Sequence, residues 1–167
     1  MTDYLEVFRL FEDNADANKA AEMKAYMRDQ FPFLGLPTPL RKSLSKNFLK
    51  TAKDDSWADW AFIGLCWEKP QREFQYLAVG YLDAVKDVLG TDDVPRIKRI
   101  AVTKSWWDTI DGLDRIVGNI ALNYSEVNEI LLQWSLDENI WLRRIAIDHQ
   151  LPRREKTDTA LLRGILV

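Results

Sequence analysis

A tryptophan, an aspartate and an arginine, spaced by one helical turn and one helical repeat, carry the clearest chemical signal in the sequence. Trp107 and Asp111 lie four residues apart, so on a helix they share one face, about one turn from each other. Arg144 follows at the start of a later predicted helix. A tryptophan face attracts cations, a carboxylate stabilises positive charge or orients a water, and an arginine holds a phosphate. The three residues predict a site for a flat cationic or sugar-phosphate ligand.

Each of these residues also has a purely structural interpretation. Arg144 could pair with Asp111 in an ordinary interhelical salt bridge. Asp108 lies in the first turn of its predicted helix, where an acid interacts favourably with the helix dipole, so a structural role explains it well. Asp111 lies too deep in the helix for this interaction, and aspartate is a poor helix former there, so a structural role explains Asp111 less well. Tryptophans near helix starts usually belong to the core, and at most one of an adjacent pair can point into a groove; this applies to Trp106, Trp107 and Trp141.

Three lysines form a basic stripe that follows a predicted helix start at Thr38-Pro39. Lys42, Lys46 and Lys50 recur every four residues. Such a stripe can follow a phosphate backbone, or it can be a solvated helix face. Two further residues are predicted to have structural roles. His149 has no serine or cysteine nucleophile nearby and is interpreted as a surface or packing residue, and Cys66 lies in an apolar helix and is interpreted as buried and inert.

The elements that must position these residues are all helices. Apolar residues recur at helical spacing, and no segment shows convincing period-two alternation, so the sequence predicts an all-α fold. Capping residues and prolines mark the predicted helix starts: Thr38, Ser56, Pro70, residues 91–93, Ser105, Ser125, Asn139 and Thr157.

Alternate predicted helices begin about 35 residues apart, the period of a helix-pair repeat. Tetratricopeptide signature residues are missing, so a HEAT-like solenoid of antiparallel helix pairs fits better. Its second helices would line a concave groove. One period of about 34 residues carries Asp111 to the neighbour of Arg144, which predicts that the two side chains face each other.

Composition narrows the class of protein. The chain has 167 residues, 47% of them hydrophobic, with a net charge of -3, and neither half is polarised; this indicates one helical-repeat domain over residues 1–167. One cysteine and one histidine exclude a disulfide scaffold and a Cys/His zinc site. No transmembrane run or signal peptide is present, which predicts a cytoplasmic protein without membrane contact. No nucleotide fingerprint or metal motif occurs, so no cofactor or metal is expected.

Five segments together resemble the AlkD-type DNA alkylation-repair glycosylases, which are HEAT-like solenoids. The most specific are Lys-Ser-Trp-Trp-Asp-x-x-Asp and the later Asn-Ile-Trp-Leu-x-Arg, and the match covers nearly all of the chain. The segments are residues 24–27, 33–41, 72–75, 103–111 and 139–144.

The resemblance implies a cofactor-independent, monofunctional DNA glycosylase, a hydrolase that removes N3- and N7-alkylated purines from duplex DNA and acts at the nucleoid. It places the catalytic aspartate at Asp111, the groove tryptophan at Trp107, the DNA-contacting arginine at Arg144 and the groove tyrosine at Tyr26. Lys42 and Lys46 would add DNA contacts. An alkylated purine is already cationic and leaves without a general acid, so a carboxylate that stabilises the oxocarbenium-like sugar and positions water suffices.

The resemblance also implies about two further helical repeats, whereas this chain ends at Val167 in an apolar segment. We therefore expect a shortened member of the family that lacks its C-terminal repeats and self-associates through that end. The alternative is a non-catalytic helical-repeat module that binds DNA or a protein partner. Burial of Asp111 in a closed salt bridge, with Trp107 packed inward, would favour that alternative.

Overall fold

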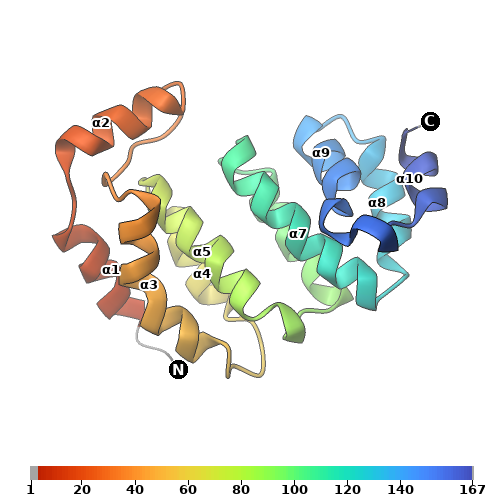
Figure 1. Cartoon of the computed structure of the whole chain (residues 1–167), viewed down its shortest axis with the longest axis horizontal. Helices are drawn as coiled ribbons and strands as arrows, with labels where there is room; N and C mark the ends of the chain where they lie inside the picture. The colour runs from red at the N-terminus through yellow and green to blue at the C-terminus, as the bar shows by residue number, and fades with distance from the viewer. Residues whose placement is uncertain (1–3, 167) are drawn as a thin grey trace. The chain divides into compact units, whose positions relative to one another are not determined.

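The computed structural model describes residues 4–166, and all of their regular structure is helical (Figure 1). This confirms the predicted all-α class. Within these residues, no helix combines the length and the apolar character needed to cross a membrane. The helices fall into two compact units, one up to Val85 and one from Lys86.

The first unit packs around a cluster of aromatic rings. Phe62 on α4 is central, with its ring centroid 5.0 Å from that of Phe48, 5.1 Å from that of Tyr81 and 6.1 Å from that of Phe8. Cys66 is fully buried in this core, and burial raises the pKa of its thiol, so the predicted inert packing role is confirmed. The helices are α1 (Tyr4–Asp13), α2 (Ala17–Tyr26), α3 (Thr38–Ala52), α4 (Trp60–Glu68) and α5 (Arg72–Ala84).

A buried glutamate ties the loop before α3 to the start of α5. The Glu73 carboxylate accepts hydrogen bonds from the backbone N–H groups of Leu34, Gly35 and Leu36 at 2.9, 2.9 and 3.1 Å. Gly35 has φ +90° and lies against the Asp16 carbonyl, a position that only glycine fills without strain. This contact joins residues 33–41 to residues 72–75, two of the segments that carry the family resemblance. It directs the chain into α3.

The second unit places α9 between two other helices. Helix α9 (Ile140–Asp148) packs against α7 (Trp107–Asn123) on one side and α8 (Val127–Ser135) on the other. Their buried residues include Ile110, Leu113, Leu131, Leu142 and Ile145. The remaining elements are the 3-10 helices η1 (Lys86–Val88), η2 (Thr91–Asp93) and η3 (Leu151–Lys156), with α6 (Val94–Ala101) and α10 (Thr159–Leu166).

Two of the connections are short, so the helices that they join pack as antiparallel neighbours. Residues 69–71 join α4 to α5, and residues 136–139 join α8 to α9. The helix starts keep the predicted spacing along the chain: Trp60, Val94, Val127 and Thr159 form one series, and Arg72, Trp107 and Ile140 form the other.

Several predicted helix starts differ from the observed ones. The helix predicted to begin at Ser56 begins at Trp60, because the side chain of Asp59 accepts a hydrogen bond from Phe62 N–H and caps it. Ser105 does not cap α7; its hydroxyl donates instead to the Ala101 carbonyl at 2.6 Å. Asp158, rather than Thr157, caps α10. The predicted cap at Asn139 is confirmed, since its side chain accepts from Trp141 N–H.

A glycine allows α7 to approach the end of α9 closely. A Cβ atom at Gly118 would overlap the backbone carbonyl of His149. His149 itself is buried, its Nδ1–H donates to the Ala146 carbonyl at 2.7 Å, and burial lowers its pKa to about 4. Of the two roles expected for His149, surface or packing, the structure shows the packing role. The spacing of α7 and α9 depends on Gly118.

Candidate functional site

An aspartate on α7 and an arginine on α9 form a two-point ion pair. Arg144 Nε donates to Asp111 Oδ1 at 2.6 Å, and a second guanidinium nitrogen donates to Asp111 Oδ2 at 2.9 Å. This geometry confirms the prediction that the two side chains face each other across neighbouring helices. The hydrogen bond with Asp111 raises the pKa of Arg144, so the guanidinium stays charged.

The ion pair is open to solvent. The Asp111 side chain is 38% exposed and that of Arg144 is 42% exposed. Trp107, one turn before Asp111 on α7, is 39% exposed. The interhelical salt bridge of the structural interpretation is therefore present, but Asp111 is not buried in it and Trp107 is exposed. In these two respects the arrangement differs from the one expected of a purely structural scaffold.

The neighbouring tryptophan takes the packing role. The rings of Trp106 and Trp141 lie 5.8 Å apart between their centroids, and both residues are half-buried. Of the adjacent pair, Trp107 is the more exposed member, as the prediction of a single outward-pointing tryptophan requires.

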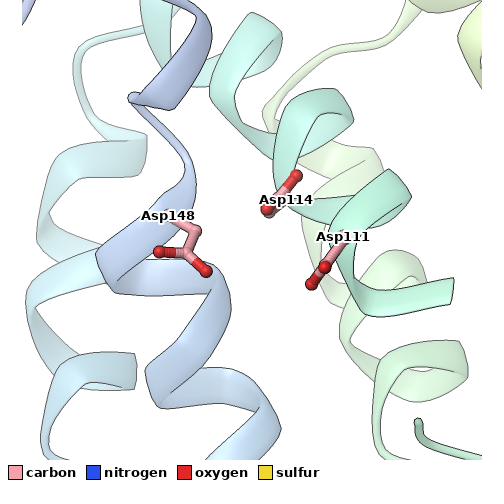
Figure 2. Close-up of side chains that lie close together, drawn as sticks. All are labelled: Asp111, Asp114 and Asp148. Carbon is pink, nitrogen blue, oxygen red and sulfur yellow. The ribbon is translucent and has the colours of Figure 1, made fainter. Parts of the chain in front are cut away.

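Two further carboxylates lie beside the ion pair, and sequence reasoning missed both. One carboxylate oxygen each from Asp111, Asp114 and Asp148 lie within 4.8 Å of one another (Figure 2). Asp148 Oδ2 is also 3.7 Å from Arg144 Nε. Helical spacing could have identified these two carboxylates in the sequence, because Asp114 follows Asp111 by one turn and Asp148 follows Arg144 by one turn.

Asp114 is the buried member of this acidic triad, which we define as Asp111, Asp114 and Asp148. It is 3% exposed. Burial raises the pKa of Asp114 to about 7, and the negative charges of Asp111 and Asp148 contribute in the same direction. The triad therefore offers three oxygen ligands but carries a cost in stability once all three carboxylates are ionised.

This cost in stability predicts that Asp114→Asn stabilises the protein at high pH, measured in buffer containing EDTA. The pKa of Asp114 is higher in the folded chain than in the unfolded chain, so the wild-type protein loses stability as the pH rises from about 4 to about 7. Asparagine never ionises, so at pH 8 we expect the variant to be more stable by about 2 kcal/mol, or roughly 4–8 °C in Tm. The gain should disappear at pH 4.5. Thermal melts at both pH values measure it, and a gain independent of pH would contradict the assignment.

The remaining predicted site residues lie in the first unit. Tyr26, at the end of α2, is 74% exposed. Lys42 and Lys46 are exposed on α3, as is Lys50, so the basic stripe is a solvent-facing surface. The contacts of these residues with DNA stay predictions.

Comparisons with known proteins give a consistent result. The family model described as "DNA alkylation repair enzyme" matches residues 8–167. The chain is similar to a solved structure from Enterococcus faecalis, described as a predicted DNA alkylation repair enzyme. The TM-score is 0.81 and the sequence identity 30%, over 91% of this chain and 72% of that one. No curated protein matches the chain. The extent of the family match shows that this protein belongs to the DNA alkylation repair enzyme family.

Proposed function

We propose that this protein is a DNA glycosylase that hydrolyses the N-glycosidic bond of cationic N3- and N7-alkylated purines in duplex DNA. The observation that carries the proposal is the exposed Asp111 carboxylate, held by two hydrogen bonds from Arg144, with the exposed Trp107 one helical turn before it on α7. Membership of a DNA alkylation repair family supports alkylated DNA as the substrate.

The ion pair suits a reaction that develops positive charge on a sugar. A guanidinium that binds both carboxylate oxygens fixes their orientation. A preorganised negative charge stabilises an oxocarbenium-like transition state most strongly when no reorganisation is needed as the charge develops. Arg144 would thus position Asp111 and would also contact a phosphate group of the DNA.

The proposed reaction needs no acid to activate the leaving group. The bond between C1′ and the purine nitrogen breaks, and its electron pair neutralises the cationic base, which leaves as a neutral methylpurine. Positive charge passes to C1′ and the ring oxygen of the deoxyribose, opposite Asp111. A water oxygen, oriented by Asp111, then forms the new bond to C1′, and the extra proton of this water passes to solvent.

Trp107 and the first unit would bind the substrate. The indole face of Trp107 attracts a cationic base or lies against the deoxyribose. Tyr26, Lys42 and Lys46 would contact the sugar-phosphate backbone, where lysines supply binding that weakens as salt rises.

The direct test is release of 7-methylguanine and 3-methyladenine from methylated duplex DNA, with the free bases quantified by chromatography. Release supports the proposal. DNA binding without release, by folded protein, would favour the alternative of a non-catalytic helical-repeat module.

The two hydrogen bonds of the ion pair lead to a prediction for Arg144→Lys. Lysine keeps the charge but lacks the planar fork, so it cannot hold both oxygens of Asp111. We expect the single-turnover rate of base release to fall on the order of 10-fold. Arg143→Lys is the matched control, because Arg143 donates to the backbone carbonyls of Asp137 and Glu138 and not to the site. Equal rates in the two variants would contradict a positioning role for Arg144.

A further inference from the structure

The three carboxylates of the acidic triad converge from two helices. Asp111 and Asp114 lie on α7 and Asp148 lies at the end of α9. One oxygen from each lies within 4.8 Å of the other two. Figure 2 shows Asp114 between the other two in this view, with one of its oxygens directed toward α9.

Asp114 is buried with one of its carboxylate oxygens unpaired. The residue is only 3% exposed, and its Oδ1 atom has no hydrogen-bond partner within residues 4–166. A buried carboxylate oxygen without a partner is costly, so its presence calls for a group that binds it. The packing of α7 on α9 holds this oxygen beside two other carboxylates.

The charges around the triad do not balance. The Arg144 guanidinium contacts it, at 2.6 Å from Asp111 and 3.7 Å from Asp148. The charge of Arg115, an exposed residue of α7, also acts on Asp114, but less strongly than the burial and the carboxylates that raise its pKa. The three carboxylates and the guanidinium in contact with them leave two negative charges when all are ionised. A divalent cation would neutralise both.

We propose that Asp111, Asp114 and Asp148 form a binding site for a hard divalent cation such as Ca²⁺. The site has oxygen ligands alone, which favours Mg²⁺, Mn²⁺ or Ca²⁺ over zinc or copper. Two ligands of Ca²⁺ can lie up to about 5.2 Å apart, given Ca–O distances of about 2.3–2.6 Å. The three oxygens, all within 4.8 Å of one another, are close enough to bind one such ion. Water would complete the coordination on the side where Asp111 and Asp148 are open to solvent.

The cation and Arg144 would share Asp111. This has a consequence that rests on the proposed glycosylase function: a bound cation neutralises the charge that stabilises the oxocarbenium-like sugar. Cation binding should therefore slow base release, which makes the triad an inhibitory site rather than a catalytic metal centre.

The test is isothermal titration calorimetry of the whole chain with CaCl₂ at pH 8, without DNA. Metals are first removed with EDTA, and the EDTA is removed by gel filtration. We expect one Ca²⁺ per chain, and at least a 10-fold loss of affinity in Asp114→Asn and in Asp148→Asn. Asp92→Asn is the matched control, since it removes one exposed carboxylate of the same unit outside the triad and should leave binding unchanged. MnCl₂ titrations show whether the site discriminates by size.

Three results would overturn the site: no heat of binding up to millimolar Ca²⁺, equal affinity in all three variants, or occupancy by a proton alone. The last would appear as a carboxyl NMR signal of Asp114 whose titration does not change with Ca²⁺. Circular dichroism establishes that each variant is folded. Because Ca²⁺ binding is measured without DNA, the titration tests the cation site even if the protein releases no methylpurine. The inhibitory role is tested separately, by slower release of methylpurines by the wild type in the presence of Ca²⁺.

Discussion

Replacing Asp111 with asparagine is expected to lower the rate of methylpurine release from methylated duplex DNA by at least about 100-fold, or about 3 kcal/mol of transition-state stabilisation. Asparagine has nearly the shape of aspartate and can still accept one hydrogen bond from Arg144. What it lacks is the negative charge opposite the developing oxocarbenium ion. The effect should fall on the single-turnover rate rather than on DNA affinity.

The measurement compares wild type, Asp111→Asn and Asp92→Asn under single-turnover conditions, with DNA binding followed in parallel. Asp92 is an exposed carboxylate of the same unit, so its replacement controls for the loss of one surface charge. Loss of release with retained DNA binding in Asp111→Asn places the chemistry on the carboxylate. A rate equal to that of wild type would refute the proposed role of Asp111.

The largest effect on stability is expected from Gly118→Ala. Alanine is the better helix former by about 1 kcal/mol, so helix propensity alone predicts stabilisation. The added methyl group, however, would overlap the His149 carbonyl, which is backbone and cannot rotate away. Helix α7 must then move from the end of α9, and we expect a net loss of about 2–3 kcal/mol in the free energy of unfolding.

This substitution should also reduce base release without touching the site. Asp111 and Gly118 lie on α7, whereas Arg144 and the residue opposite Gly118 belong to α9 and its end. Any increase in the distance between the helices stretches hydrogen bonds that are now 2.6 and 2.9 Å long. Unchanged release with lowered stability would show that the ion pair tolerates the movement.

Gly64→Ala is the matched control for the stability measurement. Gly64 lies inside α4, and a Cβ atom there would meet no other atom within 4 Å. With space available, helix propensity decides the sign, and we expect a gain of about 0.5–1 kcal/mol. Denaturant unfolding of both variants measures the contrast. A loss in both would mean that glycine itself, rather than the contact with His149, is required in these helices.

The parts of the site that follow the helical repeat could be predicted from the order of the residues. The period along the chain brings Asp111 opposite Arg144, and the observed hydrogen bonds agree with it. The helical class and the cap at Asn139 rest on local patterns within a few residues of each other, and local patterns need no knowledge of the fold. The start of α4 was predicted at Ser56, whereas Asp59 caps the helix by accepting a hydrogen bond from Phe62 N–H.

The rotation of each helix about its axis was set by packing that local sequence patterns do not reveal. Adjacent residues on a helix point about 100° apart, so either Trp106 or Trp107 could have faced solvent. Packing of Trp106 against Trp141 leaves Trp107 exposed. The same packing of α7 on α9 buries Asp114 and brings Asp148 beside it, although the two residues are far apart in the chain. Local periodicity thus accounts for the helices and for the pairing of Asp111 with Arg144, whereas the acidic triad arises from tertiary contacts between side chains of two helices.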